Sequence, residues 1–317
     1  METFLRIFCL KHLSMDQQSL EHVIPDAIGG SLIINDVCKT CNSLLGSNID
    51  VHLVSNFLIE MKRFDKNLLG RRKNLKFPLS KGELKPGSGK FVLWNPIAAT
   101  EKRLKLERYI RFIKVKDGTA RLLVSLDIPE VESLPVIIKK MTEKYRKKGY
   151  EINSTDINFE EKTVKNPSLY YEHDFDFIGY QLALLKIVYE VAYINLGSDF
   201  MEYEIAKSTR ELLIKSNVDF EEILNHRIRG KIGFYKIEDD PFGFLQGPDH
   251  VIVTMGNPVN AIYVRIFDVF TCHILLKEDS QPILESMEKA SIREFDTAKR
   301  TNTVLTMFEA ISKYAHE

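Results

Sequence analysis

The sequence has few of the features that would direct a protein into a membrane or an oxidising compartment. Its 317 residues include four cysteines and one tryptophan, and no run of about 18 apolar residues occurs, so we expect no membrane span. The apolar patch near the start is short and interrupted by Arg6, which argues against a signal peptide. We therefore expect a cytoplasmic protein with reduced thiols, whose clustered cysteines bind metal rather than form disulfides.

The chain as a whole also lacks a net charge of either sign, but its basic and acidic residues are unevenly distributed. The net charge is zero, with 44 basic and 44 acidic residues. Between Lys62 and Lys148 there are 24 Lys and Arg against 9 Asp and Glu, a net of +15. Such a block favours contact with a polyphosphate backbone. A solvated basic surface balanced by acidic neighbours in the fold explains it equally well, and both interpretations stay open.

The patterns along the chain predict an α+β fold, because helical and strand-like segments are mixed without a strict βαβ order. We expect a small N-terminal module over residues 1–62, a basic linker or loop over 63–90, and a larger mixed α+β domain over 91–317. A hairpin is predicted around Asp117-Gly118, and strands within 250–276 with a turn at Gly256-Asn257-Pro258. Helices are predicted over 40–62, 130–148, 176–197, 200–216 and 292–315.

Four potential zinc ligands occur as two pairs. Cys9 and His12 form the first pair, and Cys38 and Cys41 form the second. A two-residue gap lets both side chains of a pair reach one tetrahedral ion, and two pairs complete its coordination. A segment this small cannot be stabilised by burial alone, and a structural zinc supplies on the order of 10 kcal/mol in comparable peptides. The alternative is that Cys9 is a core thiol and His12 a surface imidazole.

The segment between the two pairs carries the most specific signal. It contains Glu21-His22-Val23-Ile24-Pro25 and Gly29-Gly30, then Asn35, and Asn42 directly after the second cysteine pair. Over residues 9–50 this resembles the HNH endonuclease family, in particular the subgroup with an EHxxP…GG…CxxCN pattern and two zinc knuckles. The resemblance implies a zinc-stapled ββα-metal module, in which two strands and a helix surround one catalytic divalent ion.

The resemblance also implies roles for individual residues. His22 would be the general base that activates water, and its near-neutral pKa in free peptides suits that task. Glu21 and Asn42 would hold the catalytic ion, and Asn35 would orient the histidine. Oxygen ligands of this kind favour Mg²⁺ or Mn²⁺. We expect Gly29-Gly30 to form a tight turn that lets the backbone approach phosphate. Asp50 and His52 lie one helical face beyond Asn42. We favour ordinary surface residues for both, and contact with the metal or the nucleic acid is the alternative.

The favoured hypothesis is a metal-dependent endonuclease that cuts nucleic acid, with DNA preferred over RNA as substrate. A role in restriction or anti-phage defence is consistent with a standalone protein of this kind. One module has one active centre, so a double-strand break predicts a homodimer. Two alternatives stay open: an effector nuclease gated by an activating ligand or protein partner that the C-terminal domain senses, and a non-catalytic zinc module that only binds nucleic acid. No membrane partner is expected.

Overall fold

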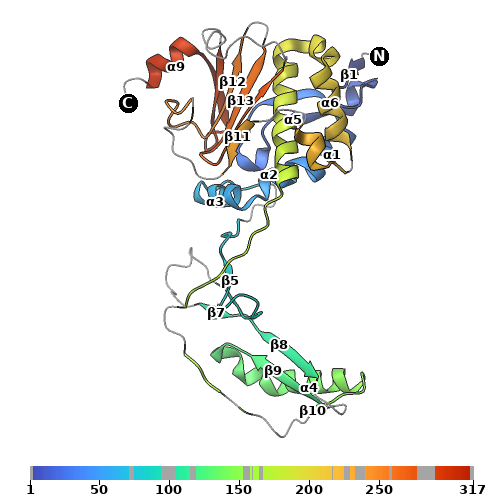
Figure 1. Ribbon diagram of the computed structural model, residues 1–317, viewed down its shortest axis with the longest axis vertical. Helices are drawn as coiled ribbons and strands as arrows, with labels where there is room; N and C mark the ends of the chain where they lie inside the picture. The colour runs from blue at the N-terminus through green and yellow to red at the C-terminus, as the bar shows by residue number, and fades with distance from the viewer. Residues whose placement is uncertain are drawn as a thin grey trace. The chain divides into compact units, whose positions relative to one another are not determined.

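The computed structural model describes residues 3–70, 75–93, 104–114, 119–152, 158, 160–163, 167–215, 217–224, 229–232, 240, 242–256, 259–276 and 290–314. The chain forms two compact units. Unit 1 comprises residues 1–75 and 174–317, and unit 2 comprises residues 76–173. In unit 1, helix α5 (Phe177–Leu196) lies between an antiparallel sheet and the N-terminal elements (Figure 1).

The N-terminal part of unit 1 contains the strand–strand–helix order that the resemblance implies. Strand β3 (Gln18–His22) pairs antiparallel with β4 (Ile33–Cys38), and helix α1 (Lys39–Leu45) follows β4 directly. Before them, β1 (Thr3–Leu5) and β2 (His12–Ser14) form a short hairpin. The predicted ββα module is therefore present, within a mixed α+β chain.

The helix predicted over residues 40–62 is interrupted. From α1 the chain continues through a π-helical turn (Gly46–Asp50) into α2 (Val51–Val54), and helix α3 (Phe57–Asp65) begins after Asn56. Asn56 has an extended backbone, and its side-chain oxygen accepts a hydrogen bond of 3.0 Å from the Leu58 backbone N–H. Its side chain thus caps a new helix, which is why the prediction of one continuous helix was wrong.

Helix α5 is the centre of unit 1. Apart from Lys186 and Glu190, its buried residues are apolar or aromatic and lie on all sides, as is typical of a helix buried all round. It ends at Gly197, whose φ is +66°. The helix predicted over 176–197 is confirmed. The segment Phe177–Glu202 is long and apolar enough to cross a membrane, but 78% of its most apolar window is buried inside the structure, as in the core helix of a soluble protein. Helices α6 (Glu204–Ile214) and α7 (Phe220–Leu224) follow.

A six-stranded antiparallel sheet packs against α5. Its order is β11-β14-β13-β12-β15-β16. Side chains of the central strands alternate between two cores: Ile252 and Ile262 face the core that contains α5, while Val253 and Tyr263 face a second core that contains Ala310. Both faces are therefore covered, which explains why apolar side chains occupy both faces of the central strands. The strands are β11 (Arg229–Ile232), β12 (His250–Met255), β13 (Ala261–Ile266), β14 (Phe270–Leu275), β15 (Ser291–Asp296) and β16 (Thr301–Thr306).

The last segment of the chain differs from its prediction. In place of a helix over 292–315, residues 291–306 form the hairpin β15–β16, and only α9 (Met307–Tyr314) is helical. The turn at 297–300 contains neither glycine nor proline, and Arg300 supplies its positive φ of 53°. Apolar residues on both faces of the hairpin resembled helical spacing, so the helix prediction was wrong.

The two compact units do not follow the boundaries predicted from sequence. Ile24 and Leu45 of the ββα region share one hydrophobic core with Leu184 of α5 and Val264 of the sheet. His250 is fully buried, and its Nε2 donates a hydrogen bond of 2.8 Å to the Ile28 carbonyl. The N-terminal region and the C-terminal half are thus one folded body. The separate unit is the segment between them.

The described residues of unit 2 form two small sheets, a 3-10 helix (Ile128–Ser133) and the helix α4. Strands β8 and β9 pair antiparallel on either side of the predicted Asp117-Gly118 turn, which itself lies outside the described residues. Helix α4 (Leu134–Arg146) covers part of the predicted helix over 130–148. The strands are β5 (Lys81–Glu83), β6 (Phe91–Leu93), β7 (Lys105–Leu106), β8 (Tyr109–Lys114), β9 (Thr119–Ser125) and β10 (Glu151–Ile152).

Candidate active site and metal centre

The β3–β4 hairpin positions Glu21 and His22 at the end of β3. In the strand pairing, Glu21 is opposite Ile34 and His22 is opposite Ile33. The Val23 backbone N–H then donates to the Leu32 carbonyl at 3.0 Å, which continues the hairpin past the histidine. Glu21 is almost fully buried, whereas His22 is half-buried. The strand end thus presents the imidazole near the surface and carries the carboxylate inward.

The two glycines of the motif serve the packing of unit 1. Gly29 has a φ of +89°, and a Cβ there would collide with Thr297. A Cβ on Gly30 would collide with the Ile24 carbonyl. Both glycines are buried. The expectation that this turn lets backbone approach phosphate is therefore wrong: the two glycines pack against Ile24 in the same loop and against Thr297 in the turn between β15 and β16.

Asn42 joins helix α1 to strand β3. Its Nδ2 donates to the Ser19 hydroxyl at 2.9 Å and to the Leu20 carbonyl at 2.8 Å. Because a carbonyl can only accept, these bonds fix the amide orientation and leave Oδ1 as the group available to a cation. The predicted pair His22 and Asn42 therefore lies on two elements that are hydrogen-bonded to each other.

Asn35 lies in β4, two residues after the strand partner of His22. It sits in the middle of β4, beside a register shift at Ser19, and its side chain is exposed. The neighbouring Ile34 and Val37 are buried instead. Asn35 therefore lies on the same face of the hairpin as Ile33 and its partner His22. In the described part of the chain no hydrogen bond joins the Asn35 amide to His22, and the orienting role of Asn35 stays a prediction.

A buried lysine, which sequence analysis missed, organises the inner side of this site. Lys186 of α5 is fully buried, forms an ion pair with Glu21, and donates a hydrogen bond of 2.9 Å to the His22 carbonyl. Its ammonium also lies 3.2 Å from the Asp50 carboxylate and 3.6 Å from that of Glu190. A lysine and a glutamate four residues apart in an otherwise apolar helix were the available signal, because buried charges are seldom present without partners.

The carboxyl groups around Lys186 have perturbed pKa values. Burial raises the pKa of Glu190 well above its usual range, and the charges of Glu21 and Asp50 raise it further, against the effect of Lys186. Burial also raises the pKa of Asp50, although the positive charges of Lys186 and His22 oppose this. The pKa of Lys186 is raised because its three acidic neighbours outweigh the effect of its burial. The cluster therefore places one ammonium group among three carboxyl groups, next to the backbone of His22.

Asp50 and His52 are more than the surface residues that were expected. Asp50 is about five-sixths buried and interacts electrostatically with His22, as described above. His52 of α2 forms an ion pair of 2.6 Å with Asp176, the residue that caps α5. The π-helical turn and α2 thus connect the ββα region to the start of α5.

Three of the four predicted zinc ligands come together. The thiols of Cys9, Cys38 and Cys41 all lie within 4.8 Å of one another. His12 is not in this group: it begins β2, opposite Leu5, and is exposed. The pairing of β1 with β2 holds it there, so in this structure the first knuckle contributes its cysteine alone.

The surroundings of the thiols fit a negatively charged metal centre. Burial would raise the pKa of Cys38, but hydrogen bonds from the backbone and side chain of Cys41 and from Arg6 lower it to about 7. Arg6 is itself buried, and its Nε and Nη2 have no hydrogen-bond partner among the described residues. A guanidinium held beside thiols in this way balances the charge of a tris-thiolate zinc centre.

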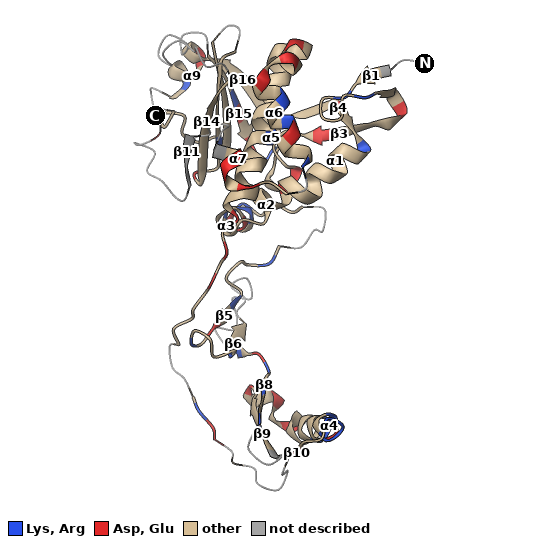
Figure 2. Cartoon of the chain, turned by 45° about the vertical axis from the view of Figure 1, so that its right-hand side comes forward, with Lys and Arg blue, Asp and Glu red and all other residues tan. Residues whose placement is uncertain are grey.

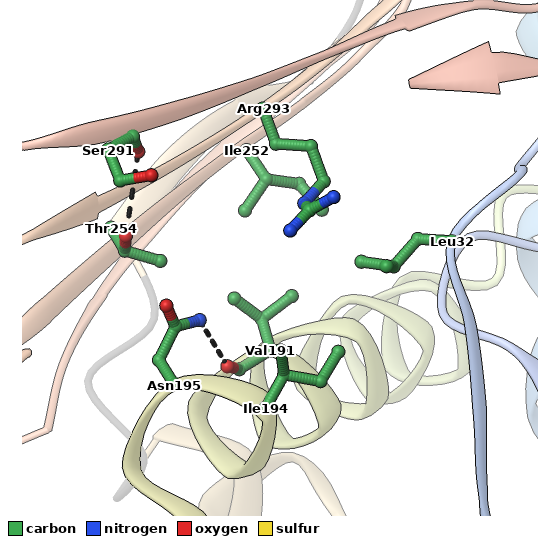
Figure 3. Close-up of a pocket in the computed structure, with 8 residues that line it drawn as sticks. All are labelled: Leu32, Val191, Ile194, Asn195, Ile252, Thr254, Ser291 and Arg293. Atoms are coloured by element: carbon green, nitrogen blue, oxygen red, sulfur yellow. Dashed lines mark hydrogen bonds between the residues drawn. The ribbon is translucent and has the colours of Figure 1, made fainter. Parts of the chain in front are cut away.

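A separate pocket lies at the end of α5, away from these residues (Figure 3). Arg293 of β15 points into it across from Val191 and Leu32, and it is also lined by Ile194, Asn195, Ile252, Thr254 and Ser291. It has room for about one water molecule. This pocket therefore gives no support to an activating ligand the size of a nucleotide.

Comparison with known proteins places the N-terminal region in a family. Residues 7–58 match the family described as HNH endonuclease. The match covers the thiol cluster and the ββα elements, and it confirms the resemblance found in the EHVIP, Gly-Gly and CxxCN patterns. No curated protein and no solved structure matches the chain. The chain thus contains an HNH endonuclease domain, which indicates a nuclease that acts on nucleic acid.

Proposed function

We propose that the protein is a metal-dependent endonuclease that hydrolyses phosphodiester bonds in DNA, with His22 as its general base. The observation that carries the proposal is the contact between α1 and β3: Asn42 is hydrogen-bonded to the strand that ends in His22. A neutral amide oxygen and an imidazole, held on two connected elements, are the groups that hydrolysis by an activated water requires.

Each residue has a proposed part. The half-buried His22 imidazole takes the proton from water, and Asp50, when ionised, stabilises the imidazolium that results through its electrostatic interaction with His22. Asn42 Oδ1 would help to hold a Mg²⁺ or Mn²⁺ ion, whose charge would stabilise the phosphate as negative charge develops. Glu21 was expected as a second ligand, but its ion pair with Lys186 makes a supporting role the better fit.

A structural zinc on Cys9, Cys38 and Cys41 would stabilise the same domain. Three thiols within 4.8 Å satisfy three of the four positions of a tetrahedral ion. His12, three residues after Cys9, is the proposed fourth ligand, although it must leave its place opposite Leu5 to reach the thiols. The reduced cysteines are consistent with a cytoplasmic setting, and one active centre per chain predicts nicking by a monomer and duplex breakage by a dimer.

The test is a plasmid-cleavage assay with the full chain, comparing the parent protein with His22→Ala in Mg²⁺, in Mn²⁺ and without added divalent ion. We expect metal-dependent nicking that the variant lacks. His173→Ala is the matched control, because His173 is an exposed histidine in unit 2. It should cut like the parent. Bound zinc, measured in all three proteins, reports that the domain is folded.

The proposal is overturned if His22→Ala cuts as fast as the parent while its zinc content is unchanged. Absence of cutting by the parent on duplex DNA, single strands and RNA would instead support a zinc module that only binds nucleic acid. Cutting that starts only after a cell extract is added would support an effector that needs an activating ligand or partner.

A further inference from the structure

Helix α4 of unit 2 has one apolar side and one basic side. Its inner side packs on β8, where Phe112 and Tyr145 stack with ring centroids 3.9 Å apart, and Ile137 is buried. The exposed side carries Lys140, Lys144 and, at the helix end, Lys147. The spacing of four and three residues places these three on one stripe of the helix.

The basic charge of this helix is not balanced locally. Six basic residues and one acidic residue lie between 139 and 148. In the described part of the chain none of these six forms an ion pair, whereas Lys105 and Arg108 of the same unit both pair with Glu130. Residues 76–173 contain 20 Lys and Arg against 13 Asp and Glu, a net of +7, so the rest of the chain carries −7. Figure 2 shows Lys and Arg along α4.

An exposed helix of this kind fits the backbone of duplex DNA. Its 13 residues span about 20 Å, and a helix is narrow enough to enter or border a DNA major groove about 12 Å wide. The major groove of an RNA duplex is too deep and narrow for this. Apart from Pro135, Val136 and Glu143, the exposed side presents flexible ammonium and guanidinium groups, which contact phosphates rather than read bases.

We propose that Lys140, Lys144 and Lys147 on α4 form a surface that binds the phosphate backbone of duplex DNA, which makes unit 2 the DNA-holding part of the protein. The choice of DNA as the polyanion rests on the proposed nuclease function. The binding itself does not require catalysis, and it is expected to show little sequence preference.

The test measures binding separately from cutting. A fluorescent DNA duplex is titrated with the full chain carrying His22→Ala, without added Mg²⁺ or Mn²⁺, at several salt concentrations. Each lysine that contacts a phosphate releases about one counterion, so the slope of log Kd against log salt should fall by about 2.7 in Lys140→Gln/Lys144→Gln/Lys147→Gln. The matched control is Lys81→Gln/Lys105→Gln/Arg108→Gln, which removes the same charge from residues already paired with Glu107 or Glu130.

The proposal stands if the α4 variant loses affinity and slope while the control keeps most of both, even if the parent protein never cuts DNA. It is overturned if the His22→Ala protein does not bind duplex DNA, if both triple variants weaken binding equally, or if an RNA duplex of the same length binds more tightly. Circular dichroism of both variants reports that α4 is still folded.

Discussion

Lys186 of helix α5 donates a hydrogen bond of 2.9 Å to the backbone carbonyl of His22, although 164 residues separate them in the sequence. The same ammonium pairs with Glu21, the residue before the histidine. The position of the proposed general base is therefore held by the C-terminal half of the chain. Variants of Lys186 should reveal how much this contact contributes to the stability of the protein and to cleavage.

Replacing Lys186 by methionine should destabilise the protein by about 3–5 kcal/mol, because it leaves Glu21 and Asp50 buried without their cation. The double variant Lys186→Met/Glu21→Gln should recover part of that loss. Cleavage should remain low even in the double variant, since neither side chain then holds the His22 carbonyl. Denaturant unfolding and plasmid nicking check the two effects, and full recovery of nicking would contradict a positioning role for Lys186.

The buried His250 should make stability depend on pH. Burial lowers its pKa from 6.5 to about 4, so the folded state keeps the imidazole neutral. In the unfolded chain the group takes up a proton below pH 6.5, which favours unfolding. The free energy of unfolding should thus fall by up to about 3 kcal/mol as pH drops from 6.5 to 4, and be unaffected by this group above 6.5.

His250→Gln tests this assignment. Glutamine retains a donor for the Ile28 carbonyl and an acceptor for the Phe267 backbone N–H, but it does not titrate. We expect lower stability at pH 7 and a flatter dependence between pH 6.5 and 4, measured by urea unfolding at each pH. An unchanged slope would assign the acid sensitivity to other groups.

Zinc binding should depend on the clustered thiols and not on the fourth cysteine. Cys38→Ser should reduce bound zinc from about one per chain to none and lower the melting temperature, because a structural zinc contributes much of the folding energy of a small module. Cys272→Ser is the control: Cys272 is fully buried in β14, with a pKa raised to about 12 by burial. Elemental analysis should find its zinc retained, and loss of zinc there would count against the assigned site.

Two glycines of the HNH region should respond in opposite ways to alanine. Gly29→Ala should destabilise by more than about 2 kcal/mol, since φ is +89° and the new Cβ meets Thr297. Gly46→Ala should stabilise by about 0.5–1 kcal/mol, because Gly46 is helical and nothing lies within 4 Å of its added Cβ. Thermal unfolding of the pair checks the direction of each change.

Local patterns were sufficient for the elements whose signals are local. The EHVIP, Gly-Gly and CxxCN residues predicted the ββα order, and the apolar run ending at Gly197 predicted α5. They failed where a turn uses unusual residues, as at Arg300, or where a polar side chain caps a new helix, as at Asn56. In these cases a single residue decides between two continuations of the chain.

The interior of the site could not be predicted, because its partners are distant in sequence. Spacing within residues 1–62 says nothing about Lys186, Glu190 or the Thr297 contact of Gly29. The spacing also predicted that His12 joins the thiols, whereas in the structure its strand pairing with Leu5 keeps it away from them. Long-range packing determines each of these features, and the periodicity of one segment does not report it.

The core shared by the ββα region and the C-terminal half limits how the HNH region could be produced as a separate fragment. Residues 1–62 contribute Ile24, Leu45, Leu53 and further apolar side chains to a core whose remaining members, apart from Leu68, lie beyond residue 176. A fragment ending near the family match would therefore expose these side chains to water. Residues 76–173 instead form a compact unit of their own. The boundaries of the folded units therefore differ from those of the family match: the HNH region belongs to the larger unit, and the segment between its two parts is the separate one.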